Sequence, residues 1–384
     1  MRGEQGADSR ADRSVVPLLW VWFALVVYAS LYPFAGWRIP VSASAAEWLV
    51  LPWPRRWTAF DAVSNLLGYL PLGTLGFIVA RQHGRAFAGS MAAAVAGGAL
   101  LSLAMEELQN FLPQRVPSRM DWALNIAGTA LGALVAAALL ATGAAARWHA
   151  VRDRWFVERS GGAVALLLLW PVGLLYPPPL PLGMGHVIVE LPRVAAAVLA
   201  DTSWAAWLDD RTAAAAAPVA PLSGGEEVLA IALGLLAPCL VAYSVARRGW
   251  RRGVLAGGAI ALGFGATTLA TALNFGPEHA FSWRTAAFWP AFVLGITLAA
   301  LLALLPRRAA AGVGLVALTA LVALVARAPA DPYYAHSLHE WAQGRFIRFH
   351  GVAQWVGWFW PYAAMLYLLV RLGAHDDAPP TITR

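Results

Sequence analysis

Long apolar segments alternate with short polar connections along most of the chain. Ten of these segments have roughly the length that an α-helix needs to cross the ~30 Å hydrocarbon core of a bilayer. They cover residues 15–34, 61–80, 87–111, 121–143, 161–177, 228–246, 253–273, 285–305, 309–326 and 352–371. The pattern therefore predicts an all-α fold, a polytopic transmembrane helical bundle of about ten helices.

The composition agrees with a membrane protein. Of the 384 residues, 59% are hydrophobic and 13% are charged, whereas soluble domains carry about 25% charged residues. All 28 basic residues are Arg, which beside the heavy use of Ala indicates a GC-rich bacterial coding bias. They lie in short clusters between apolar segments, so nucleic-acid binding is not expected. The single cysteine, Cys239, cannot form an intrachain disulfide and is interpreted as a buried structural thiol.

The distribution of charge predicts the orientation. Connections and tails assigned to the inside carry 17 Arg and seven acidic residues, whereas those assigned to the outside, with the adjoining helix ends, carry 11 Arg and 14 acidic residues. By the positive-inside rule both termini lie inside, in a multi-pass protein of the bacterial cytoplasmic (inner) membrane. The first segment is longer than the apolar core of a signal peptide and lacks a clear cleavage site, so it is predicted to be a retained helix.

Five regions are predicted from these segments. They are a cytoplasmic tail (1–14), a four-helix core (15–147), a fifth helix with an extracytoplasmic interfacial loop (148–225), a five-helix bundle (226–373) and a second cytoplasmic tail (374–384). A Pro-rich stretch opens the segment 178–225, which continues with an amphipathic helix from Val187 to Trp207 and an Ala/Pro-rich linker. This segment is the predicted boundary between an N-terminal and a C-terminal bundle.

Acidic, amide and arginine residues gather at one end of the second, third and fourth apolar segments. Within each segment they are spaced so that they share one helix face. Polar groups at membrane depth are costly unless they pair or meet water, so such a cluster is a candidate site. The candidate ligand-binding residues are Asp61, Asn65, Ser102, Glu106, Gln109, Arg115, Arg119, Asp121 and Asn125.

The second and fourth segments share one motif. The spacing D-x3-N-x2-G begins at Asp61 and recurs sixty residues later at Asp121, which suggests two helical hairpins related by a parallel repeat. Arg115 and Arg119 lie in the connection before the second copy, within reach of Glu106 or Asp121.

Two interpretations of the cluster are open. Interhelical hydrogen bonds of this kind contribute about 0.6 kcal/mol each, at most near 2, and alone would hold the bundle together. Asp61 and Asp121 also stand at helix N-termini, where capping alone explains a carboxylate. Nine converging polar groups are nevertheless more than packing needs, which favours a binding or catalytic pocket.

The segment also resembles a known family. Its polar and glycine residues resemble the pattern of the VanZ-like bacterial membrane proteins. The matching residues are Asp61, Asn65, Pro71-Leu72-Gly73, Ser102-x3-Glu106-x2-Gln109, Arg115, Asp121-x3-Asn125-x2-Gly128 and Gly132. The resemblance covers residues 15–145. It implies a shared polar site on the outer side and, through the family's association with lowered susceptibility to teicoplanin, an antibiotic-resistance role, but no defined reaction.

The expected function is binding of an envelope-related amphiphile, either a lipid-linked cell-wall or glycan intermediate or a lipoglycopeptide. Arg115 and Arg119 would hold a phosphate or carboxylate through forked hydrogen bonds. One alternative is an enzyme that modifies such an intermediate, with Glu106 or Asp121 as general acid or base. Another is a secondary transporter, although transporter sites usually lie near the bilayer midplane. Oligomeric state is not predicted.

Other features carry weaker signals. No nucleotide-binding or nucleophile motif is present, and no cofactor or metal is predicted. A metal site built from His336, His339, Glu340 and His350 is one interpretation of the loop 328–350, and solvated interface residues are the other. A further outside turn contains four candidate rim residues, Asn274, Glu278, His279 and Arg284.

Overall fold

The computed structural model describes residues 4–32, 51–54, 58–113, 115–158, 160–189, 222–328 and 347–373, with further positions at 34, 36–39, 191 and 195. Within these ranges the chain forms helices and no β-strand beyond one isolated bridge. The predicted all-α class is therefore confirmed. The predicted helix from Val187 to Trp207 and the predicted loop 328–350 lie almost entirely outside the described residues.

All ten predicted segments overlap a helix. The helices are α1 (Glu4–Leu31), α3 (Ala59–Gln82), α4 (Phe87–Gln109), α5 (Arg119–Ala141), α6 (Ala144–Trp155), α7 (Gly161–Gly173), α10 (Gly224–Tyr243), α11 (Trp250–Phe275), the 3-10 turn η1 (Pro277–His279), α12 (Phe288–Leu302), α13 (Arg307–Val325) and α14 (Ile347–Gly373). By length and composition α3, α4, α5, α10, α11 and α13 can each cross a membrane, and three shorter apolar helices accompany them. The chain is a multi-pass membrane protein, and its orientation stays a prediction.

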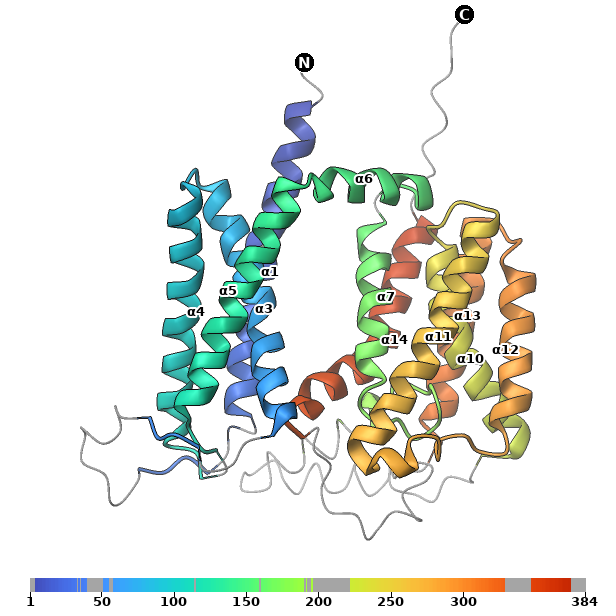
Figure 1. Ribbon diagram of the computed structural model, residues 1–384. Coiled ribbons are helices and arrows are strands. Elements are labelled where there is room, and N and C mark those ends of the chain that lie inside the picture. Colours follow the sequence, from blue (N-terminus) through green and yellow to red (C-terminus); the bar gives the residue numbers. More distant parts are fainter. Residues whose placement is uncertain are drawn as a thin grey trace, which may run out of the picture. The chain divides into compact units, whose positions relative to one another are not determined.

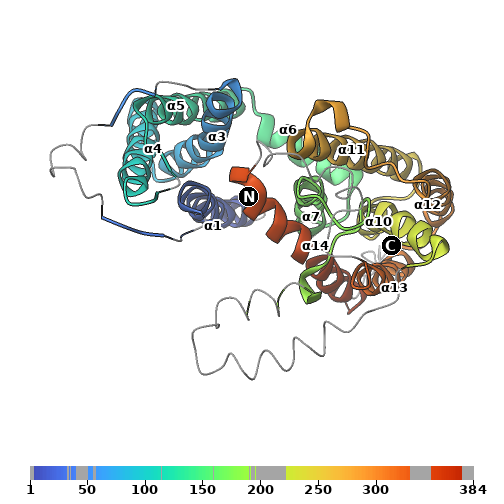
Figure 2. The same ribbon diagram turned by 90° about the horizontal axis from the view of Figure 1, so that it is seen from below.

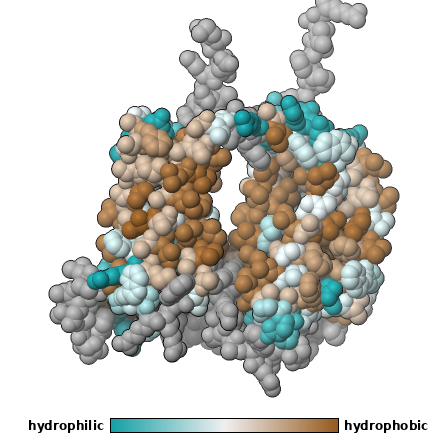
Figure 3. All heavy atoms as spheres, viewed as in Figure 1, coloured by the Kyte–Doolittle hydropathy of each residue, from teal (hydrophilic) through white to brown (hydrophobic). Residues whose placement is uncertain are grey.

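The chain divides into two compact units, Met1–Ala150 and Val151–Arg384, which are described separately. α7 lies in the second unit and packs there against α10, α11 and α14. The five predicted regions stay predictions. In each unit hydrophobic side chains cover the helix sides and hydrophilic residues gather at the helix ends, as expected for helices surrounded by lipid (Figure 3).

Unit 1 is a bundle of α1, α3, α4 and α5 (Figures 1 and 2). Its most extensive packing joins the parallel helices α3 and α5, because glycines let their backbones approach. A Cβ on Gly132 would lie 1.9 Å from the carbonyl oxygen of Leu70, and one on Gly128 would lie 2.2 Å from that of Leu66. The Thr74 hydroxyl donates to the carbonyl of Gly132 at 3.0 Å across the same contact. These contacts fix the register of the two helices.

α3 runs without a break through Pro71. The next residues place Gly73 against α5, where an added Cβ would meet the Thr129 carbonyl oxygen at 1.9 Å. Proline removes one backbone donor from the helix. In α3 this proline stands between Leu70, whose carbonyl faces Gly132, and Gly73, which faces Thr129.

α3 and α5 begin in the same way. The Thr58 hydroxyl accepts a hydrogen bond from the Asp61 amide at 3.1 Å, and the Ser118 hydroxyl accepts one from the Asp121 amide at 3.3 Å. Such N-caps satisfy amides that have no partner inside the helix. The repeated motif therefore extends three residues upstream, to [S/T]-x2-D-x3-N-x2-G.

In unit 2, α10 lies at the centre and packs against α7, α11, α12 and α13. Most of its residues from Ala230 onward are fully buried, as expected for a helix that is apolar all round. A capping box of Ser223 and Glu226 begins the helix. Arg327, just after α13, donates to the Glu226 carboxylate and joins the two helix ends.

Arg252 of α11 is fully buried in unit 2. One guanidinium nitrogen donates to the carbonyls of Ala303 at 2.8 Å and Leu305 at 2.6 Å, after the end of α12. The other donates to Tyr243 at 2.8 Å, the last residue of α10. A cation at helix C-termini is favoured by the helix dipole and satisfies carbonyls that lack helical partners.

Candidate functional site

The nine predicted site residues come together at one end of unit 1, where α1 and α4 end and α3 and α5 begin (Figure 1). We call this region the polar end. Hydrogen bonds between distant parts of the chain help to hold it together: Gln109 Nε2 donates to the Ser30 carbonyl at 3.2 Å, the Arg38 amide to the Phe111 carbonyl at 2.9 Å, and the Arg119 amide to the Pro52 carbonyl at 3.0 Å. The polar end thus contains the end of α1, the start of α3 and the connection from α4 to α5, whereas the connection from α3 to α4 lies at the other end.

Five polar residues meet between α3, α4 and α5 at this end. We call Tyr69, Ser102, Glu106, Ser118 and Asn125 the inner cluster. The Asn125 side-chain amide donates to the Ser102 hydroxyl at 2.9 Å, and the Glu106 carboxylate accepts from the Ser118 amide at 2.8 Å. The Tyr69 hydroxyl lies beside Ser102 and within electrostatic range of Glu106. Every member is buried.

Three polar atoms in and next to the inner cluster make no hydrogen bond of good geometry among the described residues, although the Tyr69 hydroxyl lies close to that of Ser102. They are the Tyr69 hydroxyl, Oδ1 of Asn125, and Nδ2 of Asn65, which lies one turn before Tyr69 on α3. Buried polar groups in folded proteins are nearly always paired, so each exception calls for an explanation. Together these atoms offer a donor, an acceptor and a hydroxyl that can do both.

Arg115 lies against the end of α1. Its guanidinium donates to the carbonyls of Ala29 at 3.0 Å and Tyr32 at 2.7 Å, in and just after the last turn of α1. Together with Gln109, which bonds Ser30, it fixes α1 to the polar end. The motif spacing does not predict these contacts, because their acceptors are backbone atoms distant in sequence.

The remaining predicted residues lie at the rim. Asp61 and Asp121 are half-buried in the first turns of α3 and α5, and the Thr58 hydroxyl donates to the Asp61 carboxylate at 2.8 Å. The Arg119 side chain is exposed, and none of the hydrogen bonds or ion pairs within the described ranges involves it. Glu107 faces away from the inner cluster and accepts from the Asn110 side chain at 3.4 Å.

Tyr69 is the functional candidate that sequence reasoning missed. It follows Asn65 by four residues and therefore lies on the same helix face, so the spacing that selected Asn65 would have selected it. Ser118 was missed because its role depends on the turn that brings its amide to Glu106.

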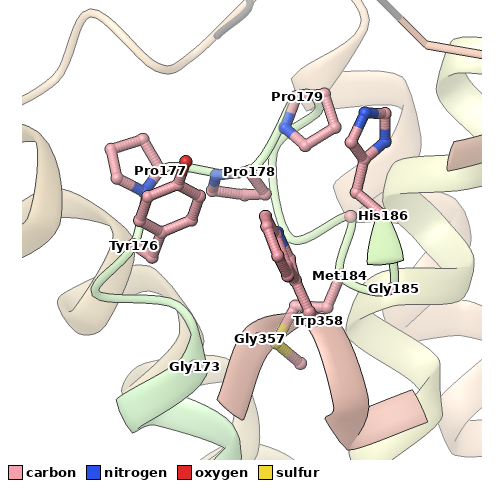
Figure 4. A pocket seen from close by; sticks show the side chains of 11 residues that line it. Gly173, Tyr176, Pro177, Pro178, Pro179, Met184, Gly185, His186, Gly357 and Trp358 are labelled. Atoms are coloured by element: carbon pink, nitrogen blue, oxygen red, sulfur yellow. The ribbon is translucent and has the colours of Figure 1, made fainter. Parts of the chain in front are cut away.

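Unit 2 contains a second polar feature, a cavity of about 60 Å³ between the end of α7 and α14. Tyr176, Pro178, His186 and Trp358 surround it (Figure 4). His186 Nδ1 contacts the Val325 carbonyl at 3.2 Å. Small-molecule sites usually measure about 300–1,000 Å³, so this space suits water molecules better than a ligand.

The other predicted groups do not form a site within the described residues. Asn274 bonds the carbonyl of Ala270 within its own helix at 2.8 Å, and Arg284 lies over the Phe281 ring. In the part of the chain that the structure describes, no three His, Cys, Asp or Glu side chains are arranged to hold a metal ion. The side chains of the proposed histidine site in 336–350 lie outside it.

The fold and the polar end define a multi-pass helical membrane protein with a buried polar cluster in its N-terminal unit. Residues 11–140 match the VanZ/LLP1 family model. The expected resemblance to the VanZ-like family is thereby confirmed for this segment, which is about a third of the chain and contains all nine predicted site residues. Searches of curated proteins and of solved structures found no match.

Proposed function

We propose that the polar end binds the headgroup of an envelope-related amphiphile, such as a lipid-linked glycan intermediate or a lipoglycopeptide, from the outer leaflet. The supporting observation is the set of buried atoms on Asn65, Tyr69 and Asn125 that make no hydrogen bond of good geometry among the described residues. Each such atom costs about 1–3 kcal/mol. A bundle built only for packing would be more stable with apolar groups in these places.

The chemistry of the three atoms indicates the kind of headgroup. A mixture of amide donor, amide acceptor and hydroxyl matches the hydroxyl and amide groups of a sugar or peptide. Arg119 at the exposed rim, with Arg115 beside it in the same connection, supplies positive charge for a phosphate or carboxylate. The ligand's apolar part would remain among the helix walls and lipid tails.

Tyr69→Phe separates binding from packing because it removes only the hydroxyl. If the hydroxyl serves a ligand, binding falls by about tenfold, the equivalent of one hydrogen bond near 1.5 kcal/mol. If it serves nothing, the variant binds as the wild type does and is equally or more stable. Tyr367→Phe in unit 2 is the matched control, since its buried hydroxyl also has no partner among the described residues.

Two measurements apply to each variant. Titration of the purified protein with teicoplanin measures lipoglycopeptide binding, and mass spectrometry of copurifying lipids measures envelope intermediates. Loss in Tyr69→Phe and Asn65→Leu but not in Tyr367→Phe supports the proposal. Equal binding in all of them, with undiminished thermal stability, leaves the cluster a packing feature. An altered headgroup structure in cells lacking the protein would instead support an enzyme.

A further inference from the structure

Unit 1 also contains a large apolar groove, separate from the polar end. Its volume is about 500 Å³, within the range of about 300–1,000 Å³ found for small-molecule sites. Three helices line it: Trp20 and Phe23 come from α1, Ala80 from α3, and Ala93 and Gly97 from α4. The inner cluster lies between α3, α4 and α5, so the two features occupy different parts of the bundle.

Small residues on α3 and α4 create the space. A Cβ added to Gly97 would meet no atom within 4 Å. At the base of the groove α3 and α4 are in contact, since a Cβ added to Gly76 would lie 3.6 Å from the Cβ of Ala94. On the α1 side, Trp22 Nε1 donates to the Gly68 carbonyl at 2.9 Å and attaches that wall to α3. The groove therefore has a closed floor, two fixed walls and an open side.

One end of the groove is basic. His83 and Arg85, in the connection between α3 and α4, line it there. Arg81 donates to the Arg85 carbonyl at 2.7 Å, and the Ser90 hydroxyl contacts the same carbonyl at 3.4 Å, so the connection is held in place. The sequence has no acidic residue between Asp61 and Glu106. This end thus presents positive charge, and neither α3 after Asp61 nor α4 before Glu106 carries an acidic residue against it.

The length of the groove fits one leaflet. Along α3 it extends from Leu72 to His83, which at 1.5 Å per residue is about 16 Å. Half of the hydrocarbon core of a bilayer is about 15 Å. An acyl chain that enters beside the basic connection would therefore end near the bilayer midplane.

We propose that this groove binds one anionic phospholipid, with an acyl chain along α1, α3 and α4 and the phosphate at Arg85 and His83. Basic pockets between membrane helices hold anionic headgroups in this way. A partner helix is the competing occupant, but it would span the whole bilayer and would not need a basic end. The site faces the opposite membrane surface from the polar end, because it lies at the other end of α3.

The test uses the full-length protein in detergent with a phosphatidylglycerol that carries a photoreactive group in its acyl chain. Crosslinks are expected on the peptides that contain Trp20, Phe23 and Gly97. Gly97→Leu fills the groove and is expected to lower these crosslinks at least fivefold. Its control is Gly257→Leu in α11, where an added Cβ also meets no atom.

Native mass spectrometry with phosphatidylglycerol and phosphatidylcholine tests the charge. Arg85→Gln is expected to weaken phosphatidylglycerol binding about fivefold and to leave phosphatidylcholine binding unchanged, whereas Arg154→Gln, an exposed arginine outside the groove, changes neither. The proposal is wrong if the crosslinks persist in Gly97→Leu or if both lipids bind Arg85→Gln as they bind the wild type. A protein dimer that dissociates in Gly97→Leu would identify a partner helix instead. Size-exclusion elution and circular dichroism confirm that each variant is folded.

Discussion

Arg252→Met removes the buried cation that joins the C-terminal ends of α10 and α12. The methionine side chain has a similar length and packs in an apolar interior, but it donates no hydrogen bond. The carbonyls of Tyr243, Ala303 and Leu305 then lose the donors that lie 2.6–2.8 Å away. We expect a strong loss of stability in unit 2.

The size of the effect follows from these contacts. Hydrogen bonds from a charged group contribute about 1.5–3 kcal/mol each, so the three short ones set an upper limit near 9, and the fourth, to the Ala246 carbonyl, is long at 3.5 Å. The variant no longer buries a guanidinium, which recovers part of this amount, and removing one partner of a buried charged network typically costs about 3–5 kcal/mol. At roughly 2–4 °C per kcal/mol for a unit of this size, Tm falls by about 6–20 °C.

Thermal stability in detergent, followed by the monomer peak in size-exclusion chromatography after heating, measures this shift. Arg251→Met is the control, because Arg251 lies over the Trp250 ring at the start of the helix and is only half-buried. Arg252→Lys should lie between, since one ammonium cannot reach both helix ends as the forked guanidinium does. If Arg252→Met melts within about 2 °C of Arg251→Met, the hydrogen bonds of the Arg252 guanidinium do not stabilise this unit.

Two further predictions concern unit 1. Gly132→Ala should cost about 1–3 kcal/mol through overpacking against the Leu70 carbonyl, seen as a lower melting temperature, whereas Gly68→Ala, where an added Cβ meets no atom, should cost nothing; equal effects would contradict the close contact of α3 and α5. Arg115→Ala removes the donors from the carbonyls at the end of α1, so hydrogen exchange of the amides in residues 29–34 should accelerate, while the exposed Arg119→Ala leaves it unchanged.

Much of the fold follows from local sequence. Each apolar segment forms a helix because, in lipid, a helix alone satisfies its own backbone groups. The helix that this pattern does not predict is α6, because it is rich in Arg and has no long apolar run. Its end is held by contacts distant in sequence, such as the Arg247 side chain on the Asp153 carbonyl.

The candidate site was predicted in location but not in its internal pairing. Helical spacing brings Ser102, Glu106 and Asn125 to one end, and they do lie there. The choice of partners depends on how helices rotate about their axes and on where connections turn. Spacing therefore does not reveal that Glu106 accepts from the Ser118 amide, or that Arg115 bonds backbone carbonyls of α1.

The tight approach of Gly73, Gly128 and Gly132 to the neighbouring backbone has a mechanical consequence. The two backbones approach so closely at these glycines that little room is left for α3 and α5 to slide or roll against each other. Any adjustment to an incoming molecule must then come from α1 or α4. α1 packs less extensively than α4 on the other helices of the unit, so it is the more readily displaced. The side chains of Gln109 and Arg115 hold its final turn at the polar end and limit that displacement there.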